Sequence, residues 1–149
     1  MRKTNKLSLS IATVAALAAS VPVLAQSDLV ASRIASYREL GAAFKNVTDE
    51  MRKSAPSPIM IRMAARDIKK MASQQYNLFP EGSNVGKTKA LPAIWRDPAG
   101  FKNAQDNFAA AANTFVTSVS SGDTGKIRTA TRELGGSCKA CHTKYRLDE

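Results

Sequence analysis

The residues best suited to chemistry stand together near the C-terminus. Cys138, Cys141 and His142 form a C-x-x-C-H pattern, which is the attachment motif of c-type haem. On a helix, residues three apart share a face, so both thiols could add to the two vinyl groups on one edge of the macrocycle. The adjacent histidine would then lie under the iron as its proximal ligand. The chain has two cysteines and one histidine, and the motif contains all three. We therefore predict one covalent haem c, with His142 as the axial ligand of its iron.

Three other interpretations of the motif stay open. An exported protein can join Cys138 to Cys141 in a disulfide, but a disulfide leaves the neighbouring histidine unexplained. A thioredoxin-like redox pair normally stands at the start of a helix in a βαβ unit, and no such unit is indicated. A zinc site needs a fourth ligand, for which the sequence offers no obvious candidate.

The first 25 residues have the pattern of an export signal. A short basic start precedes an apolar stretch over residues 7–24, and small residues stand at the cleavage position before Gln26. A retained membrane anchor is the alternative, but the stretch is short for a spanning helix and contains three serines and Pro22. We predict a signal peptide over 1–25 and a folded domain over 26–149. We also predict a periplasmic location, without stable insertion in a membrane.

The domain that remains is 124 residues long, enough for one hydrophobic core. Removing the signal leaves 19 basic and 12 acidic residues, a net charge of +7. Basic proteins can bind nucleic acid, but the charges here are mixed rather than gathered in one run, and an exported protein rarely meets nucleic acid. We expect no nucleic-acid partner.

Four segments carry apolar residues at helical spacing. Their apolar faces run over residues 30–51, 61–72, 101–119 and 127–145. Each helix start has a candidate capping residue, and these are Ser27 or Asp28, Ser57 before Pro58, Asp97 before Pro98, and Asp123. Three methionines of the second segment, Met60, Met63 and Met71, are interpreted as core fillers.

The connections between these segments define the topology. Two are short and imply antiparallel neighbours, whereas the stretch from Asn77 to Arg96 is about twenty residues long. Phe79, Leu91 and Trp95 could hold this stretch against the helices. The sequence thus predicts an all-α fold, an antiparallel four-helix bundle with one long crossover loop between helices 2 and 3.

The whole exported part of the chain resembles the cytochromes c prime and their low-spin class II relatives. The resemblance is strongest over Gly135–Arg146, which contains the C-x-x-C-H motif. It extends to Ala90–Trp95, leading through Asp97 to Phe101. In the first helix it rests on Arg33, followed by Tyr37, Leu40 and Gly41 four, seven and eight residues later.

The resemblance implies roles for three further residues. The position of Tyr37 faces the distal side of the haem, where low-spin members have a ligating methionine; tyrosine there implies a five-coordinate iron. Met51 cannot substitute, because it lies about 21 Å further along the helix. Arg33 and Arg146 match positions near the haem propionates and the proximal pocket. The alternatives are a core tyrosine and two solvated arginines.

Two functions fit these expectations. One is electron transfer through the haem iron to a redox partner protein that the sequence does not identify. The other is binding of a small gas, such as nitric oxide or carbon monoxide, at a five-coordinate iron. Peroxidase-like catalysis would require a distal acid–base pair, and the chain's only histidine is already the predicted ligand, so we expect no enzyme. The resemblance also suggests a homodimer through helices 1 and 2.

Overall fold

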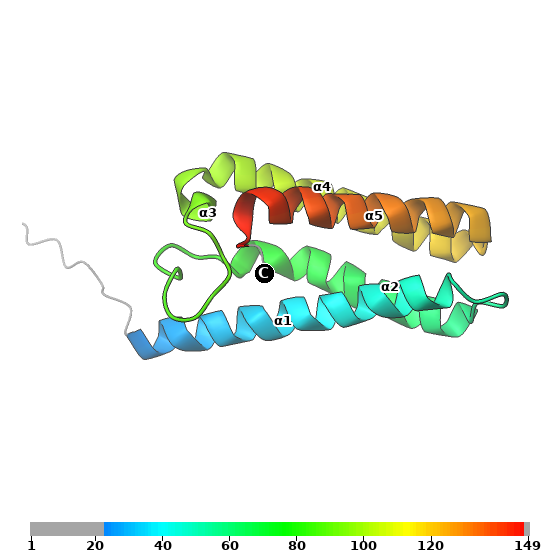
Figure 1. Cartoon of the computed structure of the whole chain (residues 1–149), viewed down its shortest axis with the longest axis horizontal. Helices are drawn as coiled ribbons and strands as arrows, with labels where there is room; N and C mark the ends of the chain where they lie inside the picture. Colours follow the sequence, from blue (N-terminus) through cyan, green and yellow to red (C-terminus); the bar gives the residue numbers. More distant parts are fainter. Residues whose placement is uncertain (1–22, 148–149) are drawn as a thin grey trace, which may run out of the picture.

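The computed structural model describes residues 23–147, which form four long helices and two short helical turns (Figure 1). In chain order these are α1 (Val23–Glu50), α2 (Pro58–Gln74), the 3-10 turn η1 (Gln75–Asn77), α3 (Ala93–Arg96), α4 (Pro98–Ser121) and α5 (Thr124–Tyr145). The predicted all-α, antiparallel four-helix bundle with a long crossover between α2 and α4 is confirmed. The short helices η1 and α3 were not predicted, because each is only one turn long.

Three of the four predicted helix starts are confirmed. The side chains of Ser57, Asp97 and Asp123 accept hydrogen bonds from the backbone of the first turns of α2, α4 and α5. These bonds satisfy amides that have no partner inside the helix. The prediction that Ser27 or Asp28 begins α1 is wrong. The helix starts at Val23, since Val23–Gln26 contains no helix-breaking residue.

The predicted signal peptide lies almost entirely outside the described residues, so the boundary between 1–25 and 26–149 stays a prediction. Within residues 23–147, no helix is long and apolar enough to cross a membrane.

The main hydrophobic core fills the half of the bundle where α1 meets α2. Its largest fully buried members are Phe115, Ile68, Leu134 and Val47. The apolar face predicted for α2 is buried throughout. Met60 and Met63 were wrongly interpreted as core residues: their exposed fractions are 43% and 47%. They lie on the outer side of α2, and only Met71 is buried.

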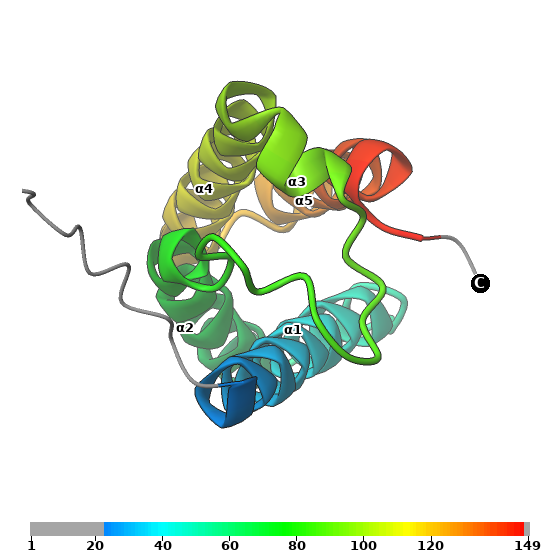
Figure 2. The same cartoon turned by 90° about the vertical axis from the view of Figure 1, so that its left-hand side faces the viewer.

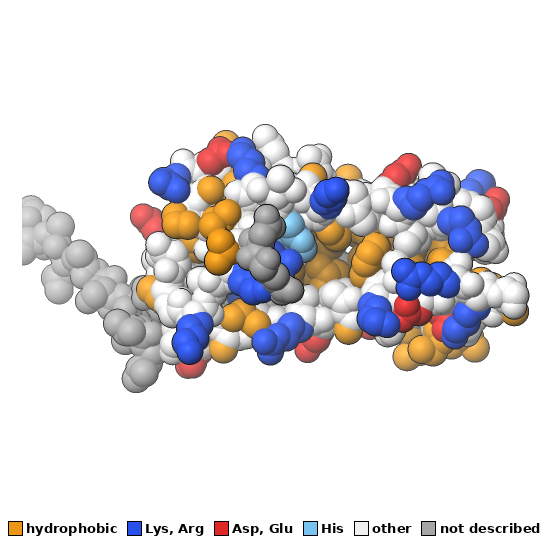
Figure 3. Space-filling model, in the orientation of Figure 1, with side chains coloured by type: hydrophobic (Ala, Val, Ile, Leu, Met, Phe, Trp, Pro, Cys, Tyr) orange, Lys and Arg blue, Asp and Glu red, His pale blue; other side chains and the backbone are white. Residues whose placement is uncertain are grey.

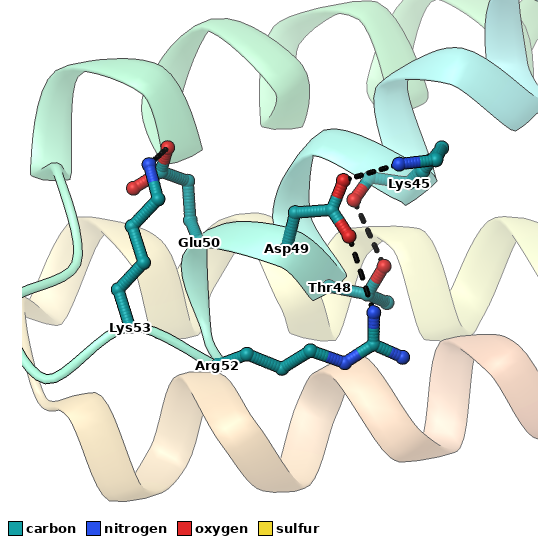
Figure 4. A network of polar contacts seen from close by, with 6 residues as sticks. All are labelled: Lys45, Thr48, Asp49, Glu50, Arg52 and Lys53. Carbon is teal, nitrogen blue, oxygen red and sulfur yellow. Dashed lines mark hydrogen bonds and ion pairs between the residues drawn. The ribbon is translucent and has the colours of Figure 1, made fainter.

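Acidic residues at the end of α1 hold the turn into α2 (Figure 4). Glu50 is buried and accepts hydrogen bonds from the backbone N–H of Ser57, at 2.9 Å, and from Lys53 Nζ. Asp49 is more exposed and pairs with Lys45 and Arg52. The Glu50 contacts fix the direction in which the chain re-enters the bundle.

A second, smaller core lies at the opposite end, under the crossover loop. Ile94, Phe101 and Tyr145 are buried there, and Phe79 and Trp95 pack against them. Figure 2 shows the loop passing across this end of the bundle, from α2 to α3. The prediction that Phe79, Leu91 and Trp95 hold the loop is confirmed, because the Leu91 N–H also donates to the Tyr145 carbonyl.

The helices pack in the order α1, α2, α4, α5, and α1 and α5 approach each other much less than the other neighbouring pairs. Figure 2 shows these two helices apart at the loop end. The C-x-x-C-H motif lies on α5 beside this separation.

Candidate functional site

The two cysteines lie on the last two turns of α5, between the two apolar clusters. Cys138 packs against the main core and Cys141 against the smaller one. Both side chains are half-buried and their thiols are free. Burial raises the pKa of both thiols, and the neighbouring Cys138 raises that of Cys141 further. Both side chains are therefore turned toward the inside of the bundle.

His142 follows Cys141 directly and is exposed at the surface of α5. Desolvation by the surrounding chain and the positive charge of Arg146 lower the pKa of the imidazole. The neutral ring that this favours is the form of histidine that ligates a metal. Figure 3 shows His142 beside a hollow in the surface whose walls carry apolar side chains.

Tyr37 lies across from the cysteines on α1 and is half-buried. Its ring packs against Phe79, with 6.0 Å between ring centroids. Burial is the main cause that raises the pKa of its hydroxyl, with Cys141 and Cys138 adding to the shift and Arg33 opposing it. The structure thus brings Tyr37 into the electrostatic neighbourhood of both thiols; its place on the distal side of the haem stays a prediction.

Arg33 is buried, with 2% of its surface exposed, one turn before Tyr37 on α1. Its terminal nitrogens donate four hydrogen bonds to the crossover loop: to the carbonyls of Leu78 and Ser83 and to the hydroxyls of Ser83 and Thr88. The guanidinium also lies 4.7 Å from the ring centroid of Phe79.

The charge of Arg33 has no acidic counterpart nearby within residues 23–147. Among the described residues, no carboxylate contacts its guanidinium. Burial lowers its pKa. The interpretation of Arg33 as a solvated charge is wrong; its place beside haem propionates stays a prediction.

Arg146 is exposed and directly follows α5. It pairs with Ala90 in an isolated antiparallel bridge, and the Leu147 N–H donates to the Lys89 carbonyl at 2.8 Å. The chain after the motif is therefore joined to the crossover loop. Arg146 lies close enough to His142 to lower the pKa of the imidazole; its place in the proximal pocket stays a prediction.

A polar cluster that the sequence analysis missed joins the start of α4 to the end of α5. Asp97 accepts hydrogen bonds from Lys144 Nζ at 2.6 Å, from the Tyr145 hydroxyl and from the Gly100 N–H. Lys144 and Tyr145 lie on α5, 47 and 48 residues after Asp97 in the sequence, so the spacing of residues could not reveal the cluster.

Gly135 explains how α1 and α5 come together just before the motif. A Cβ at this position would lie 3.1 Å from Cζ of Phe44, whereas a Cβ at Gly136 would meet nothing within 4 Å. The absence of a side chain at Gly135 thus lets Phe44 pack against α5. Beyond this contact the two helices separate (Figure 2), and the cysteines lie on this part of α5.

This arrangement fits a flat, largely apolar group attached to α5. Two free thiols three residues apart face inward, an imidazole stands next to them, and the opposite helix presents aromatic and cationic side chains. The competing interpretations fit less well. The two thiols are not joined, the pair is at the end rather than the start of its helix, and residues 23–147 contain no cluster of three metal-ligating side chains for zinc.

Comparison with known proteins decides the family. Residues 28–146 match the family model described as cytochrome c'. This chain belongs to the cytochrome c' family. Proteins of the family bind one covalent haem c, and so does this cytochrome c'.

Individual relatives support the assignment over the whole domain. The cytochrome c' of Rubrivivax gelatinosus is 37% identical over 94 residues, which cover 60% of this chain and 73% of the relative. The cytochrome c' of Rhodopseudomonas palustris is 30% identical over 142 residues, which cover 93% of this chain and 96% of the relative. Among solved structures, a nitric oxide complex of a cytochrome c prime variant from Alcaligenes xylosoxidans superposes with a TM-score of 0.77. It is 29% identical and covers 83% of this chain and 97% of that one.

Proposed function

We propose that the haem c of this cytochrome c' is attached by thioether bonds from Cys138 and Cys141 and ligated by His142, and that the protein transfers single electrons in the periplasm. Bound haem supplies an iron that passes between ferric and ferrous states and can take a sixth ligand. The chain supplies the rest: two thiols to fix the group, a neutral imidazole to hold the iron, and apolar walls that set its surroundings.

The observation that carries electron transfer is the exposed position of His142. A group attached to α5 at this point lies next to the surface, where a partner protein can approach it. Tyr37 and Phe79, which pack together under the crossover loop, would shield the inner side of such a group from water.

Attachment is tested by replacing Cys138 and Cys141 with alanine, singly and together. We expect each single variant to retain haem through one bond, and the double variant to lose haem in a denaturing gel. Ser137→Ala is the matched control beside the motif, and it should retain haem fully. Haem retained under denaturing conditions by the double variant would contradict the assignment.

Electron transfer itself is tested by a redox titration of the haem-loaded protein. We expect a reversible one-electron transition followed at the haem absorption bands. A haem that cannot be reduced and reoxidised reversibly would contradict electron transfer, whether or not the haem is attached as proposed.

A second function, binding of nitric oxide or carbon monoxide, is favoured by the side chain at position 37. The opposite helix presents Tyr37 toward the motif, not a methionine or histidine. Of the described methionines, Met51 and Met71 are buried beside the main core, and Met60 and Met63 are on the outer face of α2. These positions support an iron whose sixth site would be open to a gas, and a variant of a related cytochrome c prime forms a nitric oxide complex.

The pair Tyr37→Met and Tyr37→Phe tests gas binding. A thioether at this position should ligate the iron, giving a low-spin spectrum and a nitric oxide affinity lowered on the order of tenfold or more. Phenylalanine keeps the ring without the hydroxyl and should leave the iron open. An unchanged spectrum in Tyr37→Met would show that position 37 does not face the iron.

Location and assembly complete the proposal. Export with removal of residues 1–25 would deliver the protein to the periplasm, away from nucleic acid, with a redox protein as its partner. A homodimer through α1 and α2 remains a prediction, and size-exclusion chromatography with light scattering measures it. We include no catalytic reaction, because the chain has no second histidine to serve as a distal acid or base.

A further inference from the structure

One aromatic side chain of the crossover loop, Phe79, is contacted from three helices. The guanidinium carbon of Arg33 and the ring centroid of Tyr37, both on α1, lie 4.7 and 6.0 Å from its ring centroid. Phe101 of α4 packs edge-on against the same ring, with 4.8 Å between centroids, and Trp95 of α3 lies at 6.3 Å. Aromatic and cation–aromatic contacts at these distances are attractive and directional. They fix the Phe79 ring against the bundle.

The backbone on both sides of Phe79 is held as well. The Leu78 carbonyl before it accepts a hydrogen bond from Arg33 Nη1 at 3.3 Å. The Pro80 carbonyl after it accepts one from Trp95 Nε1 at 2.9 Å. Surface loops are usually mobile, because few of their backbone groups bond to the rest of the protein. Here donors from α1 and α3 hold the carbonyls on either side of one residue, so the bundle determines the position of Phe79.

Phe79 limits the movement of Tyr37 on the side where the two rings meet. An aromatic side chain changes position by rotation between staggered wells, and a packed neighbour blocks the wells that point at it. Tyr37 is also near enough to Cys138 and Cys141 for both thiols to affect its hydroxyl. The same ring thus contacts Phe79 and lies near the residues that would hold the haem. A ligand that approaches the iron on this side would have to displace the ring against Phe79.

We propose that Phe79 is a positioning residue for gas binding: it keeps the Tyr37 ring over the open side of the iron, and so admits diatomic gases while slowing larger ligands. The inference rests on the proposed gas-binding function, in which Tyr37 faces the iron. Phe79 acts through Tyr37 and need not touch the ligand. A diatomic gas requires a small displacement of the ring, whereas a ligand with a carbon chain requires a larger one, which dense packing resists. Because Arg33 and Trp95 hold the loop, Phe79 does not move aside with the ring.

Association rates of two ligands of different size test the proposal on the reduced, haem-loaded protein. The probes are carbon monoxide and n-butyl isocyanide, mixed with the protein in a stopped-flow instrument. Phe79→Leu should raise the isocyanide rate on the order of tenfold, and the carbon monoxide rate by about threefold or less, since only the larger ligand needs the space that the substitution opens. Phe115→Leu is the matched control, because Phe115 is fully buried in the main core; both of its rates should be unchanged.

A double-variant cycle shows whether Phe79 acts through Tyr37. Tyr37→Ala should raise both rates, and adding Phe79→Leu to it should change neither rate further, because a positioning residue has no effect without the side chain that it positions. An effect of Phe79→Leu that persists without Tyr37, or the same ratio of the two rates in Phe79→Leu as in the unmodified protein, would overturn the inference and leave gas binding standing. Unchanged rates in Tyr37→Ala would contradict the proposed gas site itself.

The reactivity of the Tyr37 ring gives a measurement that does not depend on ligand binding. Tetranitromethane nitrates accessible tyrosines, and peptide mass spectrometry locates the product. Tyr76 is 41% exposed and serves as the reference within the same molecule. Phe79→Leu should raise nitration of Tyr37 relative to Tyr76, because the ring loses the neighbour that covers it, whereas Phe115→Leu should leave the ratio unchanged. An equal ratio in Phe79→Leu and the unmodified protein would show that Phe79 does not hold Tyr37 in place.

Discussion

At the scale of single residues, the site combines a local motif with a distant arginine. Cys138, Cys141 and His142 could be predicted from the sequence because their chemistry depends on spacing within one helix. Arg33 could be marked only through a family resemblance. Its partners, Ser83 and Thr88, come from a loop without periodicity, so nothing in the sequence pairs them with α1.

Arg33 provides the first prediction. Arg33→Gln should lower the free energy of unfolding by about 2–3 kcal/mol, since it leaves buried loop acceptors without a charged donor. Hydrogen exchange of the amides in residues 78–91 should become faster. The stability of Arg33→Lys should lie between those of the unmodified protein and Arg33→Gln, because an ammonium group cannot make the four hydrogen bonds of a planar guanidinium.

Arg38 offers the control for this experiment, being an exposed arginine on the same helix. Arg38→Gln should change stability by no more than about 0.5 kcal/mol. Loop exchange that is the same in the Arg33 and Arg38 variants would show that the guanidinium does not hold the loop.

At the scale of helices, the sequence predicted the four long elements well, because capping residues and apolar spacing are local signals. The sequence did not predict which helix residues are buried where packing against other helices determines it. Met60 and Met63 have the composition of core residues, yet their positions on α2 face away from the bundle. The double glycine in α5 was equally ambiguous, since only the position of α1 distinguishes Gly135 from Gly136.

That glycine pair gives a prediction for α5. Gly136→Ala should raise the free energy of unfolding by about 1 kcal/mol, because a helix interior favours alanine and the new methyl group meets nothing. Gly135→Ala should gain much less or lose stability, since its methyl group would press on the ring of Phe44. Urea unfolding of both haem-loaded variants measures the difference. Equal gains at the two positions would contradict the close packing of α1 on α5.

The link between α4 and α5 should depend on pH. Lys144, the Gly100 N–H and the Tyr145 hydroxyl hold the pKa of Asp97 below its usual value. Since the folded pKa is the lower one, the stabilisation is complete above the unfolded pKa, about 3.9, and is lost as pH falls through the folded pKa. Asp97→Asn should therefore be less stable than the unmodified protein at neutral pH, and equally stable in strong acid.

Urea unfolding across the acidic range measures this convergence. Asp67→Asn is the control, because this exposed carboxylate has no ion pair within residues 23–147, and the substitution should change stability little across this range. A difference between Asp97→Asn and the unmodified protein that is constant down to acid would mean that the carboxylate does not stabilise the helix junction.

At the scale of the whole molecule, the bundle is closed at one end and open at the other. A densely packed core fills the end where α1 meets α2. At the other end, the crossover loop joins α1 through Arg33 and α5 through the bridge between Ala90 and Arg146. The loop thus holds together the two helices that flank the motif but contact each other little. The sequence predicted the loop's length and aromatic anchors, but not this bridging role.

Optical absorption of the haem-loaded protein, oxidised and reduced, with and without nitric oxide, tests the central claim most directly. The claim is that His142 holds the iron on one side while Tyr37 leaves the other side open. We predict a high-spin spectrum in both oxidation states that changes when the gas is added. A low-spin spectrum with sharp reduced bands and no response to nitric oxide would require a sixth ligand from the protein, and would contradict the account.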